Sequence, residues 1–455
     1  MRLLLILCRV LVGATFIVSG LVKANDPLGF SYKLEEYFAE SALNWPALEP
    51  WALTLAVLAC LGEIVLGFAI LVGGRMRLAT TATLILTLFF GWLTAYTDQC
   101  NQRQKAGEKM TYTVVVDGKE EVRDKTCVTD CGCFGDAMKG SIGRSLTPRE
   151  SFYKDLILFI FLLPVFIASW RKPGIGFNTA AEDRWLLGLG AVAVAIWSWV
   201  FGWSFYLLFT AVGMAGYLVI KRMVQGVKGE WVTAGWVTVL SGLFMWWCLN
   251  HLPMKDYRPF AIGKSIPEGM AVPPGEKPDV YETILTYKNT RTGEVKDFTS
   301  ADYPWQDSTW VWQATENKLV QEGYHAPIHD FTLTDVDGTD VTEGILAEPT
   351  PVLFVVSKDI TEASGKCQPA INALADAAYK NGWYVYGVTA SGYEQIEEFR
   401  HTHQNAFDYL RCDGTVLKTI IRSNPGIVLL QQGVVRGQWH CNDVPTLEEA
   451  KGALK

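Results

Sequence analysis

The sequence predicts a multi-pass α-helical membrane bundle followed by an α/β domain outside the membrane. Charged residues make up only 19% of the 455 residues, whereas soluble domains average about 25%. Seven apolar stretches approach the length of about 20 residues with which a helix crosses a bilayer. After the last of them, β-branched runs alternate with segments of helical spacing, which is typical of an α/β layer fold. The apolar stretches lie at residues 3–22, 51–73, 78–97, 153–170, 185–202, 203–220 and 231–250.

Composition excludes two broad classes of protein. The net charge is −7 and no run of basic residues is longer than two, whereas binding to nucleic acid needs a basic face. We therefore expect no nucleic-acid partner. A hydrophobic content of 49% excludes a disordered chain. The 56 aromatic residues (17 Trp, 17 Tyr and 22 Phe) lie largely beside apolar stretches, as in the aromatic belts of membrane proteins.

The uncharged segment 185–220 forms either two short helices that turn near Gly202 and Trp203 or one long tilted helix. Loop charges favour two helices. With the N-terminus in the cytoplasm, seven spans place three basic loops inside, as the positive-inside rule requires. Segments 23–50 and 98–152 and everything after 251 then lie outside. The inside loops carry Arg75 and Arg77, then Arg171, Lys172 and Arg184, and then Lys221, Arg222 and Lys228.

The first apolar stretch is either a cleaved signal peptide or a retained helix. It has no A-x-A cleavage site and Lys23 follows it directly, so we expect a retained helix. This topology fits the inner membrane of a bacterium, with the C-terminal domain in the periplasm. Membrane lipid and other envelope proteins would then surround the chain.

The outside loop 98–152 contains four cysteines and a predicted hairpin. Residues 112–116 and 120–123 alternate around Asp117-Gly118, a favoured hairpin turn pair. The loop is therefore a small folded cap. Four cysteines on an oxidising side of the membrane are expected to form disulfides.

The pairing of these cysteines is open from sequence alone. A bridge between Cys131 and Cys133 would close a small, strained ring, and strained bridges are the more easily reduced ones, which suits exchange chemistry. Alternatively, each of the two pairs with Cys100 or Cys127 as a structural staple. The spacing C-x26-C-x3-C-x-C is not that of a zinc ribbon, so we expect no metal here.

Residues 1–170 resemble two related groups of membrane proteins. Arg9 with Ser19-Gly-Leu-Val-Lys23 resembles the start of DoxX-like proteins. Glu63 with Gly67, the string Cys131-Gly-Cys-Phe-Gly-Asp136, and the segment 146–155 resemble the methylamine utilisation protein MauE. The resemblance implies a four-helix unit, to which 171–250 adds three helices.

The same resemblance implies a function. MauE-type proteins are implicated in the maturation of a disulfide-rich amine dehydrogenase, alongside a separate thioredoxin-like partner. Their bundle is similar to that of membrane thiol oxidoreductases of the DsbB and vitamin K epoxide reductase type, which have CxxC where this chain has CxC.

Two charged residues, Arg9 and Glu63, fall inside predicted spans. Charges in the membrane are rare and usually paired, so we expect these two side chains to meet. The pair is either a polar site for a quinone head group or a proton, or an ion pair that fixes two helices. Cys8, Cys60 and Cys248 are expected to be packing residues.

The region 251–325 is predicted to be a connector followed by a hairpin. Strands at 281–287 and 294–298 flank a turn at 289–293. Trp305, Trp310 and Trp312 follow, and either fill a core or lie near the membrane surface.

Residues 326–455 are predicted to form the α/β domain. A strand and tight turn begin at Ala326, and the last two strands form a hairpin. The order resembles a thioredoxin fold with an N-terminal Ala-Pro extension. Further strands are expected at 352–357, 383–389, 427–430 and 434–439, and helices at 367–380, 396–402 and 447–454.

The resemblance places the redox motif at Ser364-Gly-Lys-Cys367 and the fold's cis-proline at Pro425. Serine therefore stands at the position where the attacking cysteine is expected, and Cys367 is the one cysteine of the motif. A hydroxyl does not ionise as a thiol does, so the domain is either degenerate and used for docking, or redox-active through Cys367. Cys412 and Cys441 either form a disulfide with each other, or one of the two forms a disulfide with Cys367.

Two functions remain open from sequence. In the first, Cys131 and Cys133 exchange disulfides, Cys100 and Cys127 relay or brace them, and Cys367 takes part. Electrons pass to a quinone, held near Arg9 and Glu63, or to a thioredoxin-like partner. In the second, the protein is a non-enzymatic anchor that binds another envelope protein, and its disulfides are only structural.

Overall fold

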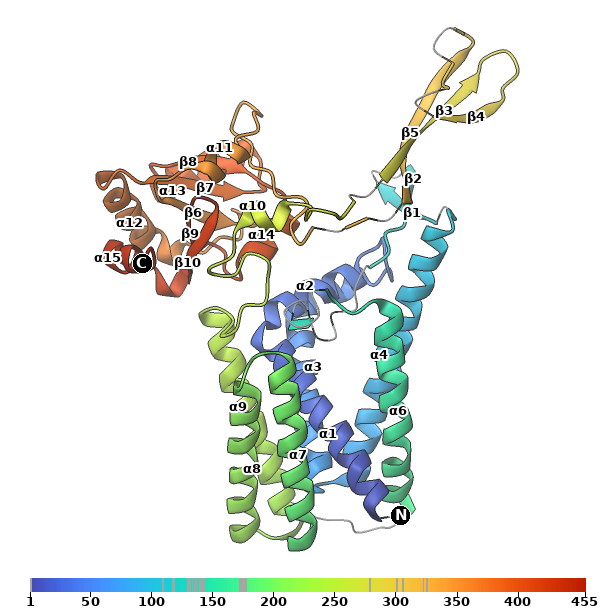
Figure 1. Ribbon diagram of the computed structural model, residues 1–455, viewed down its shortest axis with the longest axis vertical. Coiled ribbons are helices and arrows are strands. Elements are labelled where there is room, and N and C mark those ends of the chain that lie inside the picture. Colours follow the sequence, from blue (N-terminus) through green and yellow to red (C-terminus); the bar gives the residue numbers. More distant parts are fainter. Residues whose placement is uncertain are drawn as a thin grey trace.

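The computed structural model describes most of the chain and confirms the predicted membrane bundle (Figure 1). Among the described residues, seven helices are long and apolar enough to cross a membrane. These residues are 2–108, 110–116, 119–128, 132, 134, 137–138, 144–171, 178–277, 280–299, 302–304, 307–321, 323–324 and 326–455. The spanning helices are α1 (Arg2–Asn25), α3 (Ala52–Val72, after the 3-10 helix Pro46–Trp51), α4 (Met76–Lys105), α6 (Pro148–Arg171), α7 (Ala180–Val200), α8 (Phe205–Met223) and α9 (Gly226–Asn250).

Helix α1 lies at the centre of the bundle and packs mainly on α3. The two helices approach closely because glycines face each other. A Cβ on Gly67 would lie 2.8 Å from the carbonyl oxygen of Gly13, so a larger residue would push the helices apart. Helices α4 and α6 form a second closely packed pair.

The segment 185–220 forms two helices, as predicted, and the chain turns at Gly202 with φ +61°. In consequence the loop before α6, the segment after α1 and everything after α9 emerge at one end of the bundle, opposite the N-terminus (Figure 1). We call this the outer end. The chain is therefore a multi-pass membrane protein with its C-terminal domain on the outer end.

A helix that the sequence analysis missed, α2 (Pro27–Phe38), lies across the outer end. The Asp26 carboxylate caps it by accepting the amide of Gly29 at 2.8 Å, and Pro27 occupies its first position. Its buried face packs on the bundle and contains Phe30, Leu34, Tyr37 and Phe38. Its other face is free to contact the C-terminal domain.

Two β units rise from the outer end. The predicted loop hairpin is present as β1 (Thr111–Val116) and β2 (Lys119–Asp124), which pair antiparallel. The second predicted hairpin, β3 (Val280–Asn289) with β4 (Val295–Thr299), gains a third strand, β5 (Trp310–Gln321), in the order β4-β3-β5. That strand takes up Trp310 and Trp312, so they belong to a sheet rather than to a core, while Trp305 lies outside the described residues.

The C-terminal domain has a thioredoxin-like sheet in the order β10-β9-β6-β7-β8. The first three strands along the chain are parallel, and β9 and β10 are antiparallel to their neighbours. Successive residues of the central strand enter cores on opposite faces, as the period of two requires. The strands are β6 (Val352–Ser357), β7 (Tyr384–Thr389), β8 (Asp408–Arg411), β9 (Gly426–Gln431) and β10 (Val434–His440).

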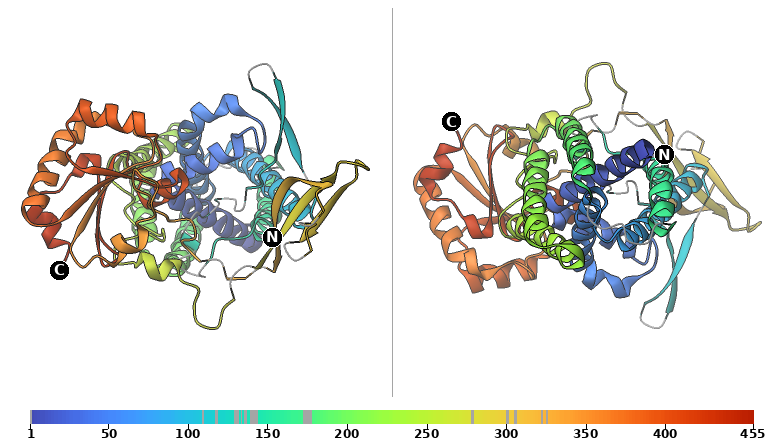
Figure 2. Two further views of the ribbon diagram at one scale, coloured as in Figure 1. Left: turned by 90° about the horizontal axis from the view of Figure 1, so that it is seen from above. Right: turned by 90° about the horizontal axis from the view of Figure 1, so that it is seen from below.

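The helices of this domain match most of the predicted ones. The main helices are α12 (Gln368–Lys380), α13 (Tyr393–His403) and α15 (Leu447–Gly452), and the short ones are α10 (Ile266–Met270), α11 (Thr342–Ala347) and α14 (Gly414–Ile420). Strand β8 and helix α14 were missed because they are only four and seven residues long. The strand expected from Ala326 is wrong, since Thr334 makes only isolated bridges there. The domain and the β3–β5 sheet lie on opposite sides of the bundle (Figure 2).

Candidate functional site

The C-terminal domain is fixed to the outer end of the bundle by ion pairs with α2 and the residue before it. The Nε atom of Arg422 lies 2.9 Å from each carboxylate oxygen of Asp26. Lys418 of α14 lies 3.2 Å from the Glu35 carboxylate. Only 9% of the Arg422 side chain is exposed, so this pair is largely shielded from water.

The Tyr32 ring on α2 is surrounded by cations of the domain. Lys358, Lys418 and Arg422 lie 5.5, 4.6 and 5.5 Å from the ring centre, within the range of cation–π attraction. Burial raises the pKa of the Tyr32 hydroxyl, although Arg422 opposes the shift, so the ring stays neutral. Because Lys358 directly follows β6, the C-terminal end of this strand lies close to α2.

A second contact joins the end of β10 to the end of α9. The side chain of Asn442 donates to the carbonyl oxygen of Asn250 at 2.7 Å. The His251 ring nitrogen lies 2.9 Å from both carboxylate oxygens of Asp443. Asn442 and Asp443 directly follow Cys441, so Cys441 lies close to the outer end of α9.

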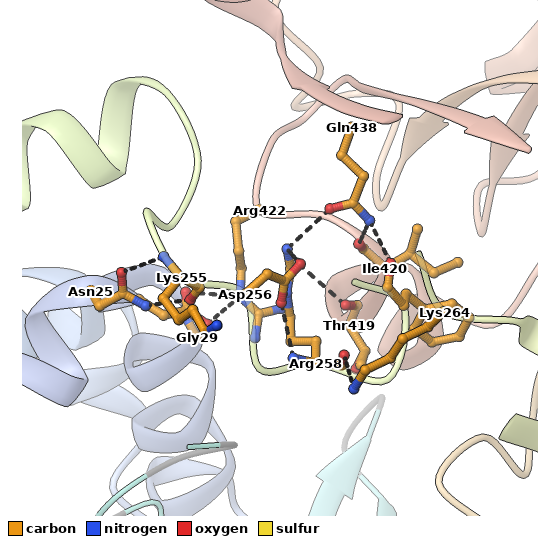
Figure 3. Close-up of polar contacts among 12 residues, drawn as sticks. Asn25, Gly29, Lys255, Asp256, Arg258, Lys264, Thr419, Ile420, Arg422 and Gln438 are labelled. Carbon is orange, nitrogen blue, oxygen red and sulfur yellow. Dashed lines mark hydrogen bonds and ion pairs between the residues drawn. The ribbon is translucent and has the colours of Figure 1, made fainter. Parts of the chain in front are cut away.

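The connector after α9 completes the attachment (Figure 3). Arg258 is almost fully buried at 2% exposure and binds both oxygens of Asp256 at 2.8 and 2.7 Å. It also donates to the carbonyl oxygen of Thr419 at 3.3 Å. Asn25, at the end of α1, exchanges two hydrogen bonds with the backbone of Lys255. The connector therefore holds α1 and α14 together.

The one cysteine of the predicted redox motif, Cys367, is bound in a disulfide. Cys367 pairs with Cys441, with Cα atoms 5.6 Å apart, and the two residues are 5% and 8% exposed. The peptide bond before Pro425 is cis, and the amide of Ser364 donates to the Asn424 carbonyl oxygen at 2.9 Å. Ser364 therefore lies beside the cis-proline, and a hydroxyl stands where the resemblance places an attacking thiol.

Cys412 is the thiol left over, and it is only 6% exposed. Burial raises its pKa to about 12, so the group is neutral and shielded. This placement disfavours attack by Cys412 on another protein. Cys8, Cys60 and Cys248 are likewise buried free thiols among the helices, as expected for packing residues.

A cavity of about 600 Å³ lies between the outer end of the bundle and the domain. Its wall comes from the end of α1, from α2, the connector and α14, and from the outside loop at Gly132 and Ala137. Most of its charges are paired within the wall, as with Lys33 and Glu36 at 2.7 Å. The cavity is therefore lined by charges of both signs, and its wall is neither uniformly basic nor uniformly acidic.

Gly132 connects this cavity to the CxC motif. It lines the cavity with φ +62°, and a Cβ on it would lie 3.0 Å from the Lys33 side chain. Phe134 is buried, with its ring 5.7 Å from Trp197 and 5.5 Å from Phe201. The predicted exchange cysteines Cys131 and Cys133 lie outside the described residues, but Gly132 between them and Phe134 directly after them are placed.

Cys100 pairs with Cys127, with Cα atoms 5.7 Å apart. This bridge ties the end of α4 to the loop 27 residues later. It resolves one alternative left open by the sequence, because neither cysteine is then available to pair with Cys131 or Cys133 in this state.

The expected contact between Arg9 and Glu63 is wrong. Both oxygens of Glu63 bind the Lys23 ammonium, at 2.8 and 2.7 Å. Arg9 instead donates to the carbonyl oxygens of Ile70 and Leu71 and to the Asn178 side chain. Arg9 and Lys23 are 14 positions apart, about 21 Å along a helix, and Glu63 on α3 lies level with Lys23.

Lys23 is the functional candidate that the sequence analysis missed. In the sequence it follows the first apolar stretch and closes the DoxX-like string, with no partner predicted for it. In the structure it is 6% exposed and also bonds Ser19 at 2.8 Å. The spacing of four between Ser19 and Lys23 was the available signal, since it places both on one helix face. Among the described residues, no group of three or more His, Cys, Asp or Glu side chains could hold a metal ion.

These features define a multi-pass membrane protein with a docked, disulfide-bridged thioredoxin-like domain on its outer end. Two family models match parts of the chain. Residues 1–99 match the methylamine utilisation protein MauE, which confirms the resemblance over the first three spans. Residues 281–322, which form most of the β3–β5 sheet, match a domain of unknown function, DUF8463.

Two solved structures are similar to the C-terminal region. A proposed protein disulfide isomerase from Bacteroides thetaiotaomicron is 18% identical and covers 28% of this chain and 82% of its own, with a TM-score of 0.23. StoA from Bacillus subtilis is 16% identical and covers 28% of this chain and 96% of its own, with a TM-score of 0.22. No curated protein matches the chain.

Proposed function

We propose that the protein carries out thiol–disulfide exchange during the maturation of exported proteins, with Cys131 and Cys133 as the exchanging pair. The observation that carries the proposal is the position of Gly132. This residue, between the two cysteines, lines the cavity under the thioredoxin-like domain. A client cysteine in that cavity would lie next to the CxC motif.

The chemistry follows ordinary exchange. A client thiolate attacks the Cys131–Cys133 disulfide, forming a mixed disulfide and releasing the other loop cysteine as a thiolate. A second client thiolate then attacks the mixed disulfide, so the client gains a disulfide and the loop pair is reduced by two electrons. A quinone or a thioredoxin-like partner protein would reoxidise the pair.

In this proposal the thioredoxin-like domain recognises the client and does not exchange electrons. Ser364 replaces the attacking thiol, and Cys367 is buried in its bridge with Cys441. The Cys100–Cys127 bridge supports the loop. The proposed setting is a bacterial inner membrane, with the outer end in the periplasm, where disulfides form. The resemblance to DoxX-like proteins and a link to methylamine itself remain predictions.

The test is differential thiol labelling of the full-length protein in graded redox buffers, read by mass spectrometry. Exchange predicts that Cys131 and Cys133 titrate above about −300 mV, since exchange proteins have potentials of about −270 to −120 mV. It also predicts that in Cys133→Ser the Cys131 thiolate attacks a model peptide disulfide, releases one peptide thiolate and stays trapped in a mixed disulfide, while Cys412→Ala, the matched control, traps none. If Cys131 and Cys133 titrate only below about −300 mV, as structural bridges do, the exchange proposal fails.

The second candidate is a non-enzymatic anchor that binds another envelope protein. It is favoured by one observation: Cys100, Cys367 and Cys441 are all less than 9% exposed, as expected for structural staples. In that case the same labelling finds every bridge resistant, and Cys133→Ser traps nothing.

A further inference from the structure

Four charged side chains gather inside the outer half of the bundle, and the proposed exchange reaction uses none of them. They are Lys23 of α1, Glu63 of α3, and Lys154 and Asp155 of α6. Lys23, Glu63 and Asp155 are only 6%, 3% and 4% exposed. Ionisable residues at such positions in a membrane are costly and mark functional sites more often than not.

The first pair is fully satisfied. The Lys23 ammonium has three protons and three partners, which are the two oxygens of Glu63 and the hydroxyl of Ser19. The rings of Phe30 and Phe90 each lie 5.6 Å from its nitrogen. This part of the cluster is therefore a closed ion pair in an aromatic setting.

The second pair is not satisfied. One oxygen of Asp155 lies 2.9 Å from the Lys154 ammonium, but the other, Oδ2, is buried and finds no hydrogen-bond partner among the described residues. A buried carboxylate oxygen without a donor costs free energy. Either a proton or a water molecule at Oδ2 would remove that cost.

A small cavity lies beside Asp155. Its volume is about 20 Å³, and its wall includes Ser19, Lys23, Glu63, Thr87 and Asp155. One water molecule needs about 10–15 Å³ of such volume and two to four polar partners. The cavity therefore has room for a single water molecule, and both acidic residues, Glu63 and Asp155, line it.

One residue lies between the small cavity and the larger cavity at the outer end. Lys23 lines both it and the larger cavity under the thioredoxin-like domain. At the other flank, the Lys154 ammonium lies 5.3 Å from the ring of Phe134, which directly follows Cys133. The buried cluster thus contacts both the outer cavity and the loop that carries the CxC motif.

We propose that Asp155 is a proton-binding site that exchanges protons with the outer cavity through a bound water beside Lys23 and Glu63. In the exchange, hydronium gives its proton to Oδ2 of the carboxylate, leaving a carboxylic acid and water, and the reverse step returns it. No electron moves. With all four side chains ionised the cluster is neutral, and the added proton makes its charge +1.

The first test is infrared difference spectroscopy of the full-length protein in lipid nanodiscs, which detects the C=O stretch of a protonated carboxyl group. We expect such a band at neutral pH, its complete loss in Asp155→Asn, and its retention in the control Asp183→Asn. Asp183 is also a carboxylate in a spanning helix, but Tyr217 and Lys221 both donate to it. The proposal is overturned if wild type shows no band, or if the band survives in Asp155→Asn.

The second test addresses the water route and keeps Asp155 intact. Thr87→Val removes a hydroxyl from the small cavity with little change of volume, whereas Thr94→Val, on the same helix, alters neither of the two cavities. After transfer to D2O, the band should shift more slowly in Thr87→Val than in wild type, and at the wild-type rate in Thr94→Val. Equal rates in all three proteins would overturn the route. Both readouts are independent of thiol chemistry, so they stand whether or not the exchange proposal holds.

Discussion

Arg422 of the thioredoxin-like domain binds both carboxylate oxygens of Asp26 at 2.9 Å, although 396 positions separate the two residues. Asp26 also caps α2 by accepting the Gly29 amide. One carboxylate therefore both starts the helix on the outer end and holds the domain that covers it. The docking of the domain and the folding of α2 are consequently coupled.

We expect Arg422→Met to loosen the domain. The substitution removes a charge-assisted contact worth about 1–3 kcal/mol and leaves Asp26 with the α2 amide alone. Trypsin should then cut faster after Lys255 and Arg258, which the docked domain shields. The control is Lys451→Met, which breaks an exposed pair with Glu448. Equal cleavage rates in the two variants would show that docking does not depend on Arg422.

Removing the Cys367–Cys441 bridge should destabilise the domain without affecting the bundle. The bridge spans 74 residues, and on the chain-entropy model a loop of that length contributes about 4 kcal/mol. In the double variant Cys367→Ala/Cys441→Ala, hydrogen–deuterium exchange should accelerate in β6 and α12 and stay unchanged in α1 and α3. Unchanged protection throughout the domain would argue against a stabilising role for the bridge.

Cys412 should make stability fall at high pH. Burial raises its pKa from 9.0 to about 12, so the folded state holds the thiol proton more tightly than the unfolded state. The stabilisation is fully present below pH 9.0 and is lost as the pH rises to about 12. The difference in unfolding free energy between wild type and Cys412→Ala should shrink over that window. Rapid alkylation of Cys412 in the native protein at pH 8 would contradict this account.

Breaking the buried Lys23–Glu63 pair should be costly. Glu63→Gln leaves an ammonium without its counter-charge, which costs about 3–5 kcal/mol at a buried site. Thermal unfolding in detergent should show a large loss for Glu63→Gln and partial recovery in Lys23→Met/Glu63→Gln. The comparison is Asp98→Asn, which breaks an exposed pair with Arg149 and should cost about 0–1 kcal/mol. Similar losses in both single variants would mean that the buried pair contributes little.

Local patterns predicted the elements well where they are long or periodic. The uncharged run 185–220 and the basic loops around it gave two helices, and the structure has α7 and α8 there. The alternation around Asp117-Gly118 gave the hairpin of β1 and β2. By contrast, β5 and α2 were missed, because β5 pairs with a strand distant in sequence and α2 is an amphipathic helix among loop-like residues.

The candidate site divides in the same way. The sequence alone predicted which residues would carry the proposed chemistry: the CxC motif, the serine at position 364, and buried charge in the first two spans. Only the tertiary structure decided their partners. Glu63 takes Lys23 rather than Arg9 because antiparallel packing sets the depth of each side chain. Cys367 takes Cys441 because strand β10 ends beside α12. Such pairings depend on how segments distant in sequence pack together, and a local sequence pattern does not contain this information.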